Sequence, residues 1–210
     1  MPEIYLDGEP FQFNGNLEKW DELLQAIYAE AGKHLRGIAK ITADGEDITS
    51  IISGTQFDKT PDKISKIEIT TRKISEIAES GIDNVKKFIP DLIKILNGAA
   101  EFLRTGETEK KNQAINGGLE GIKLIITLFI NLHNLYKFDL NKLTLSDGTT
   151  VAEKFQNLNK IFETFNNAQQ RRDDVEAADI IEYELIPLIE SFSDVFEQIR
   201  KVIEENKSVN

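Results

Sequence analysis

A run of glycine and apolar residues between positions 113 and 136 limits the fold more than any other feature of the sequence. Read at helical spacing, it carries two adjoining apolar seams: Ile115, Leu119, Ile122, Ile126, Phe129, His133 and Tyr136 form one, and Gly118, Gly121, Ile125, Leu128, Leu132 and Leu135 form the other. A helix that is apolar over so wide an arc is expected to be buried against several neighbours. We therefore predict a central helix over residues 108–137 that three other helices cover on nearly all sides.

Three further segments show the amphipathic pattern of long helices. The first, residues 73–105, keeps its apolar seam through Pro90, so we expect one kinked helix. The second opens with a capping-box signature, Thr150 and Glu153, and is expected to dissolve in the polar run 166–172. The third covers residues 173–205 with a kink at Pro187. Together the four helices predict an up-down-up-down four-helix bundle over residues 73–210.

Residues 1–72 alternate instead in the period of β-strands. Asp7-Gly8 is a turn signal between two short alternating runs, Ile4 to Leu6 and Phe11 to Phe13, and predicts a β-hairpin. Asn16 is a plausible N-cap for a helix that ends near Gly32. Residues 38–42 then predict a strand, Asp44-Gly45 a second turn, and residues 67–69, after a loop, a last strand that ends near residue 72. The expected order is strand, strand, helix, strand, strand, which makes the whole chain an α+β protein of two domains, 1–72 and 73–210.

This element order resembles the β-grasp, or ubiquitin-like, fold. The resemblance covers about a third of the chain and implies a compact module used chiefly for contacts with other proteins. The chain departs from the conjugating members of that family, because their terminal di-glycine is missing and the last strand runs directly into Lys73. Conjugation through a C-terminal glycine is therefore not expected here.

The composition indicates which binding partners and which cellular compartment to expect. The net charge is −11 and no basic stripe is present, so neither nucleic acid nor an anionic membrane surface is an expected partner. The chain has no cysteine and no signal peptide at its start, which favours the cytoplasm. The longest apolar stretch, residues 124–132, is far shorter than the roughly 20 residues of a membrane span.

The last helix holds the most informative polar residue. Glu182 lies on a seam that is otherwise apolar, between Ala178 and Leu185. Because an unpaired buried carboxylate is unfavourable, we expect Arg104, Arg171 or, through a water molecule, the surroundings of Tyr183 to meet it. Two readings remain open: a pocket lined by Asp179, Glu182 and Tyr183 that binds a ligand, or a structural polar contact that fixes helix register.

The other candidate functional residues give less indication of a binding or catalytic role. His133 is expected to be a satisfied core residue, and Tyr136 and Phe138, beside a long loop, are candidate binding residues with partial exposure. With two histidines, no Glu-x-x-His pair and no glycine-rich phosphate loop, the sequence predicts no metal, no cofactor and no catalytic residues.

We therefore expect a non-enzymatic protein-interaction module: an adaptor, chaperone-like protein or scaffold component of a bacterial assembly. The segment ADIIEYELIPLIESF, residues 178–192, resembles helical bacterial proteins of no assigned family, and it implies no residue roles. The alternative is a small-molecule binder or enzyme that uses the pocket around Glu182. A homodimer that buries an outer apolar stripe of the long helices is compatible with both.

Overall fold

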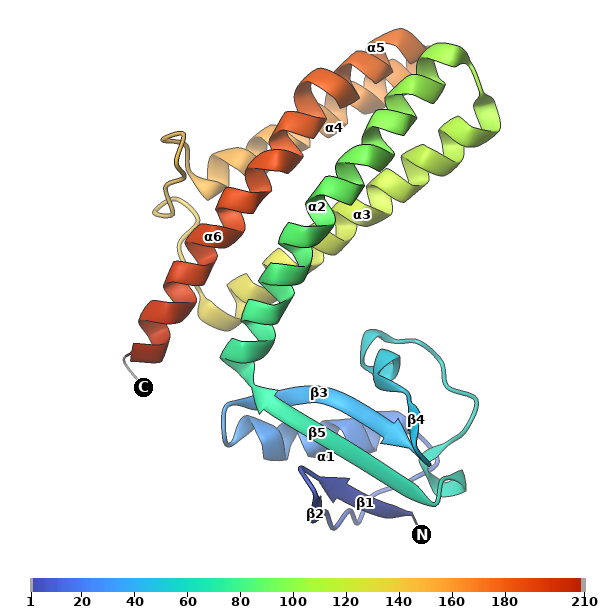
Figure 1. Cartoon of the computed structure of the whole chain (residues 1–210), viewed down its shortest axis with the longest axis vertical. Coiled ribbons are helices and arrows are strands. Elements are labelled where there is room, and N and C mark those ends of the chain that lie inside the picture. Colours follow the sequence, from blue (N-terminus) through green and yellow to red (C-terminus); the bar gives the residue numbers. More distant parts are fainter. Residues whose placement is uncertain (1, 209–210) are drawn as a thin grey trace. The chain divides into compact units, whose positions relative to one another are not determined.

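The computed structural model describes residues 2–208 and has an α+β architecture, as predicted (Figure 1). The chain divides into two compact units, residues 1–78 and 79–210, which are described separately. The first unit contains a mixed five-stranded sheet and the second consists of helices. Strand β5 ends at Lys73 and helix α2 begins at Ile74, so the change from strand to helix occurs without a linker.

The sheet of the first unit has the strand order β2-β1-β5-β3-β4. Strands β1 and β5 are parallel, and the other neighbouring pairs are antiparallel. The strands are β1 Glu3–Leu6, β2 Glu9–Pro10, β3 Arg36–Ala43, β4 Glu46–Asp47 and β5 Lys66–Lys73. Both predicted turns are confirmed: Asp7-Gly8 and Asp44-Gly45 each have two residues with positive φ, as the turn of a two-residue hairpin requires.

Helix α1, Trp20–Gly32, packs its apolar face on this sheet. Its buried residues Leu23 and Ile27 lie in one core cluster with Ile41 and Ile67 of the central strands. Two short 3₁₀ turns, η1 Thr49–Ser53 and η2 Pro61–Lys63, form the long connection to β5. Ile51 of η1 and Phe57, between the two turns, pack against the same cluster.

The predicted N-cap of α1 is wrong. The helix begins at Trp20, with Lys19 as N-cap and no side chain that caps it. Asn16 instead accepts a hydrogen bond from the backbone N–H of Glu18, 2.8 Å away, and so closes a local turn before the helix starts. This competition between local turns and helix caps is typical of asparagine.

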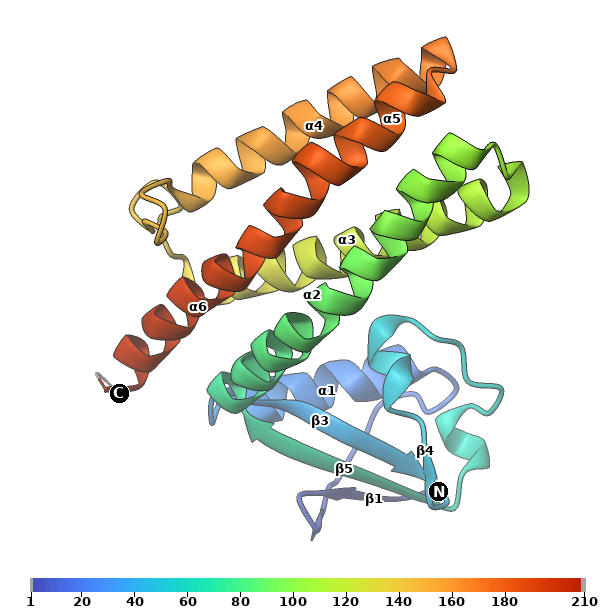
Figure 2. The ribbon, with the colours of Figure 1, turned by 45° about the horizontal axis from the view of Figure 1, so that its top comes forward.

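Helices α2, Ile74–Thr105, and α3, Thr108–Tyr136, are adjacent antiparallel helices joined by a tight turn (Figures 1 and 2). Helix α2 continues through Pro90 as one helix, as the unbroken seam predicts. The glycines of α3 lie where α2 approaches most closely. A Cβ added to Gly121 would lie 2.6 Å from Leu92 Cδ1, and one added to Gly118 would lie 2.8 Å from Leu96 Cδ2.

The prediction that other helices cover α3 on nearly all sides is wrong. The buried stripe runs where the two seams meet, through Gly118, Gly121, Ile122, Ile125, Phe129 and Leu132. The outer edge of each seam stays exposed, at Leu119 and Ile130 on one side and Leu124 and Leu135 on the other. The neighbouring helices reach only the middle of the apolar arc, so a wide apolar arc did not mean complete burial.

The whole of α3 is also more apolar than its longest unbroken stretch suggests. Within residues 2–208 it is the one helix that is long and apolar enough to cross a membrane by length and composition. In the structure, 33% of its most apolar window is buried. Its inner stripe packs within the second unit, against α2 and α6.

Helix α4, Val151–Arg171, extends further than predicted. Its start is confirmed, because Thr150 and Glu153 form both hydrogen bonds of a capping box. The polar run after residue 165 was expected to be irregular but is helical. Ala168 within this run is fully buried, so the polar residues around it form the outer face of a helix that ends at Arg172.

The last predicted helix has three parts that follow one another without a loop: α5 Asp174–Ile180, the π-helical turn η3 Ile181–Leu185, and α6 Ile186–Ser208. The irregularity predicted at Pro187 takes the form of this π-turn. Within it, the N–H of Ile186 donates to the carbonyl of Ile181, five residues back. Pro187 has no N–H to offer to Tyr183 and its ring crowds that carbonyl, so a wider turn before the proline relieves both problems.

Candidate functional site

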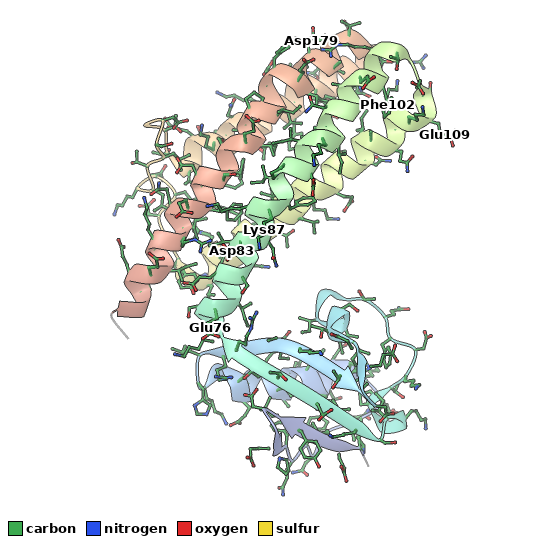
Figure 3. All side chains as sticks on the ribbon, in the orientation of Figure 1. Glu76, Asp83, Lys87, Phe102, Glu109 and Asp179 are labelled. Carbon is green, nitrogen blue, oxygen red and sulfur yellow. The ribbon has the colours of Figure 1, made fainter. Side chains whose placement is uncertain are left out.

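The predicted meeting of Glu182 with an arginine is found, and the partner is Arg104. The guanidinium of Arg104, in the last turn of α2, lies 2.5 Å from the Glu182 carboxylate and donates a hydrogen bond of 2.8 Å to Asp179. Figure 3 shows Asp179 at the same end of the helices as Phe102. Hydrogen bonds with Asp179 and then Glu182 raise the pKa of the Arg104 guanidinium. The other candidate, Arg171, pairs with Glu176 instead.

The π-turn explains why Glu182 is not in the core. The sequence places Glu182 on the core seam of a regular α-helix, but the turn contains one extra residue and rotates the chain. Ile181 is therefore buried beside Leu185, while the Glu182 side chain is half-exposed beside Arg104. The rest of the predicted seam, from Leu185 to Ile203, is buried as expected.

Tyr183 lies apart from this ion cluster, over an open groove between α4 and the last helix. The groove has a volume of about 330 Å³ and is lined by Lys154, Asn157, Ile161, Tyr183, Glu184, Pro187 and Leu188. The Tyr183 side chain is 68% exposed, whereas Ile161 and Leu188 are buried and form an apolar floor. The structure therefore brings Asp179 and Glu182 together with Arg104, and it places Tyr183 in a separate site.

An ion pair holds the side chain of Lys154 in position at one end of the groove. Lys154 on α4 is largely buried and forms an ion pair of 2.6 Å with Asp147 in the connection before α4. Asp147 also accepts hydrogen bonds from the hydroxyl and the N–H of Thr149. The hydrogen bond from Lys154, followed by those from Thr149, lowers the pKa of Asp147 far below its usual range. Asp147 therefore stays ionised and holds Lys154 in place.

The predicted partial exposure of Phe138 is wrong. Phe138 is buried, with its ring centroid 5.9 Å from that of Phe129 and 5.1 Å from that of His133. It folds back on α3 because Lys137, in the left-handed conformation, ends the helix and turns the chain. Tyr136, the other candidate, is half-buried in the last turn of α3.

His133 lies in the same aromatic cluster but is not a satisfied core residue. Its Nδ1 atom is buried and has no hydrogen-bond partner among the described residues. The ring stacks parallel to Phe129, with centroids 6.4 Å apart. No charged group among the ring contacts of this cluster gives the histidine a recognisable chemical role.

Two further features of residues 2–208 bear on ligands. A second cavity, between the inner faces of α2, α3, α4 and the π-turn, is entirely apolar and holds about 20 Å³, which is the space of a single water molecule. No group of three or more histidine, cysteine, aspartate or glutamate side chains in this range could hold a metal ion.

Sequence reasoning missed most of the groove beside Tyr183. Its lining residues come from two helices, and their approach cannot be derived from helical periodicity. Pro187 was the one available signal, because a proline inside a helix disturbs the turn before it. The proline predicts a kink, whereas the structure has an extra residue in the turn, which directs Tyr183 and Glu184 towards α4.

Fold and site together define an α+β protein in which a mixed sheet is followed by a helical unit with an open surface groove. The chain belongs to the family described as Domain of unknown function (DUF8042), whose model matches residues 80–195. The match covers more than half of the chain and includes every residue that lines the groove. No curated protein and no solved structure matches the chain.

Proposed function

We propose that this chain is a non-enzymatic protein-interaction module that serves as an adaptor, chaperone-like protein or scaffold component of a bacterial assembly in the cytoplasm. Its partner is another protein rather than nucleic acid or a membrane. The observation that carries this proposal is the placement of Tyr183, an aromatic side chain 68% exposed above a groove with an apolar floor.

An exposed tyrosine over such a groove has the properties of a protein-binding anchor. Tyrosine is enriched in protein interfaces because its large ring adds contact area and its hydroxyl can keep a polar partner. Such anchors are most effective next to apolar pockets that lose water on binding. Here Ile161, Pro187 and Leu188 supply the apolar surface, and Asn157 and Glu184 supply polar atoms at the rim.

The architecture supports the same reading. We infer that residues 1–72 form a β-grasp-like module, supported by the strand order β2-β1-β5-β3-β4 with parallel β1 and β5. We also infer that α2, α3, α4 and the continuous helix from α5 to α6 act as a four-helix bundle. Both are architectures in which function depends on the surface rather than on the fold itself.

The alternative, a small-molecule binder or enzyme, would require Asp179, Glu182 and Tyr183 to line one pocket. Asp179 and Glu182 contact Arg104, and neither belongs to the lining of the groove beside Tyr183. The described contacts therefore favour the protein-interaction module over this alternative.

Affinity capture with matched variants tests the proposal. The whole chain, the Tyr183→Ala variant and the Val175→Ala variant are compared as baits. Val175 is 62% exposed on the same helix but does not line the groove, so it controls for the loss of exposed apolar surface. We expect a partner that the parent and Val175→Ala capture equally and that Tyr183→Ala loses. Equal capture by all three baits would contradict the proposal.

A further inference from the structure

The outer side of the α2–α3 pair carries an apolar face that no other helix of the second unit covers within residues 79–208; at one end the Lys110 ammonium of α3 lies 5.5 Å from the centroid of the Phe102 ring. We name it the hairpin face and define it by Phe88, Ile95 and Phe102 on α2 and by Leu124, Leu128 and Leu135 on α3. Leu124 is 60% exposed, Leu135 47% and Ile95 37%; the other three are half-buried.

Close approaches between the two helices place Phe88, Ile95 and Leu128 of the hairpin face along the line where α2 and α3 meet. A Cβ on Gly121 of α3 would lie 3.2 Å from the Phe88 ring, and one on Gly117 would lie 3.5 Å from Ile95. At the other end, a Cβ on Gly81 of α2 would lie 3.0 Å from Leu128. The apolar side chains of the two helices therefore meet along the groove between them. Figure 3 marks Phe102 near one end of α2 and Lys87 further along it.

The residues of the hairpin face repeat every seven positions. On α2 the repeat is Gly81, Phe88, Ile95, Phe102, and on α3 it is Gly121, Leu128, Leu135, with Leu124 seven residues after Gly117. A seven-residue apolar repeat is the pattern by which one helix pairs with others along its length. Phe88 and Leu128 of this repeat already pack across the α2–α3 pair, and its exposed edge, at Ile95, Leu124 and Leu135, is available for another helix pair.

The size of the face fits a protein partner. At 1.5 Å per residue, the stretch from Gly81 to Phe102 is about 32 Å long, and two helices packed 8–10 Å apart are roughly 20 Å wide. The face therefore covers on the order of 600 Å², which is at the lower end of what each partner buries in a specific interface, where about 800 Å² is usual.

The charges at the rim favour a second copy of the same face. The chain carries a net charge of −11, but helical spacing places charges of both signs beside the face: Lys87, Asp91 and Lys94 on α2 and Glu120 and Lys123 on α3. At the Phe102 end, Lys110 pairs with Glu107 at 2.6 Å. Asp91 pairs with Lys94 at 2.8 Å, and Glu120 with Lys123 at 3.5 Å. Two such rims would not repel each other strongly, although the chains as a whole do. Because α2 and α3 are antiparallel, a two-fold axis through the face brings apolar stripes together.

We propose that the chain forms a homodimer through the hairpin face, in which the α2–α3 pairs of two copies pack against each other. This interface is separate from the groove beside Tyr183, so it leaves the groove of each copy open. A dimer with two open grooves binds two partner molecules, which suits an adaptor or scaffold.

Sedimentation velocity over a concentration series tests this inference with the full chain, a Leu124→Glu variant and a Val175→Glu control. We expect the parent chain and Val175→Glu to reach twice the mass of one chain, and Leu124→Glu to remain at the mass of one chain. Because the Leu124 side chain is 60% exposed, its replacement is not expected to unfold the chain. Circular dichroism checks that each variant is folded. If the charge in Leu124→Glu disturbs the helix, Leu124→Ser is used in its place.

Two results would overturn the inference. One is a parent chain that stays monomeric at every concentration; the other is a Leu124→Glu variant that dimerises as well as the parent. Flotation with phosphatidylcholine vesicles tests whether the hairpin face binds a lipid membrane instead of a second copy of the chain. Binding of the parent monomer to these vesicles, lost in Leu124→Glu, would assign the face to a membrane surface instead.

Discussion

Arg104 at the end of α2 lies 2.5 Å from Glu182 in the π-turn of the last helix, and this pair fixes the two helices at one end. Near the other end, Lys86 of α2 pairs with Glu197 at 2.7 Å, and Asp83 pairs with Arg200 at 2.5 Å. Charged pairs at both ends therefore set the register in which α2 and the last helix pack, while Leu92, Ile189 and Phe192 fill the core between them.

Removal of Arg104 tests the structural role of its ion cluster. We expect Arg104→Ala to lower the free energy of unfolding only slightly, because half-exposed ion pairs contribute little. Glu182→Leu is expected to be neutral or slightly stabilising, since an apolar side chain can cover the same core edge. Urea unfolding followed by circular dichroism measures both. A loss of binding by Glu182→Leu with unchanged stability would instead make Glu182 part of a binding site.

The π-turn is expected to tolerate the loss of one residue. Since η3 contains one residue more than an α-helical turn, deleting the exposed Glu184 together with Pro187→Ala restores a regular helix and leaves both flanking core registers in place. Deleting the exposed Glu190 of α6 in the same Pro187→Ala background rotates Phe192 and Phe196 out of the core. We predict cooperative thermal unfolding for the first variant and its loss for the second. Equal damage from both deletions would contradict this account of the turn.

Alanine substitutions at two glycines of the α2–α3 pair are expected to change the free energy of unfolding in opposite directions. Gly121→Ala places a methyl group 2.6 Å from Leu92, which is fully buried and has no room to move, so we expect a loss of about 1–2 kcal/mol. Gly98→Ala meets only Phe102 at 3.8 Å and should gain roughly 0.5–1 kcal/mol from helix propensity. Urea unfolding compares the two; a stabilising Gly121→Ala would show that the helices are not held this close.

Asp7 links stability of the sheet to pH. Burial raises the pKa of this carboxyl, but hydrogen bonds from the backbone N–H and hydroxyl of Thr71, at 2.7 and 2.6 Å, and the charge of Arg36 outweigh burial and lower the pKa. Because the folded pKa is the lower one, the contribution is complete above the unfolded pKa of about 3.9 and is lost as pH falls through the folded value.

Asp7→Asn keeps the turn, since asparagine also tolerates positive φ, and is expected to lower stability at neutral pH by roughly 1–2 kcal/mol. The difference in the free energy of unfolding between Asp7→Asn and the parent should shrink as the pH falls below 4 and approaches the pKa of Asp7 in the folded state, because the Asp7 carboxylate is then protonated. Fluorescence of Trp20, the single tryptophan of the chain, follows unfolding of this unit alone. A difference that stays constant with pH would mean that the Asp7 charge is not the cause.

Local pattern was enough to predict much of the fold. Turn chemistry at Asp7-Gly8 and the capping box at Thr150 depend on neighbouring residues, so the sequence predicts them well. The alternation in the first unit predicts four strands and the helix in the right order. The fifth strand, β4 Glu46–Asp47, is too short to show an alternating pattern, so the sequence does not predict it. That an arginine meets Glu182 also followed from sequence, but the choice of Arg104 over Arg171 and the half-exposure of Glu182 did not.

The remaining features depend on tertiary packing, which periodicity does not describe. How much of α3 is covered depends on where its neighbours end, so the exposure of Leu124 could not be predicted from its own helix. Phe138 is buried because the chain reverses at Lys137, a backbone conformation with no sequence signal here. The groove beside Tyr183 arises from one extra residue in a helical turn, a change too small to alter the amphipathic pattern.

The central claim, that the groove beside Tyr183 binds another protein, is tested most directly by photo-crosslinking inside the native cell. Benzoylphenylalanine replaces Tyr183 in one strain and Val175 in a second, because both side chains are exposed on the same helix. The account predicts one discrete cross-linked product with a different protein from position 183 and none from position 175. No product from position 183, or the same products from both positions, would contradict it.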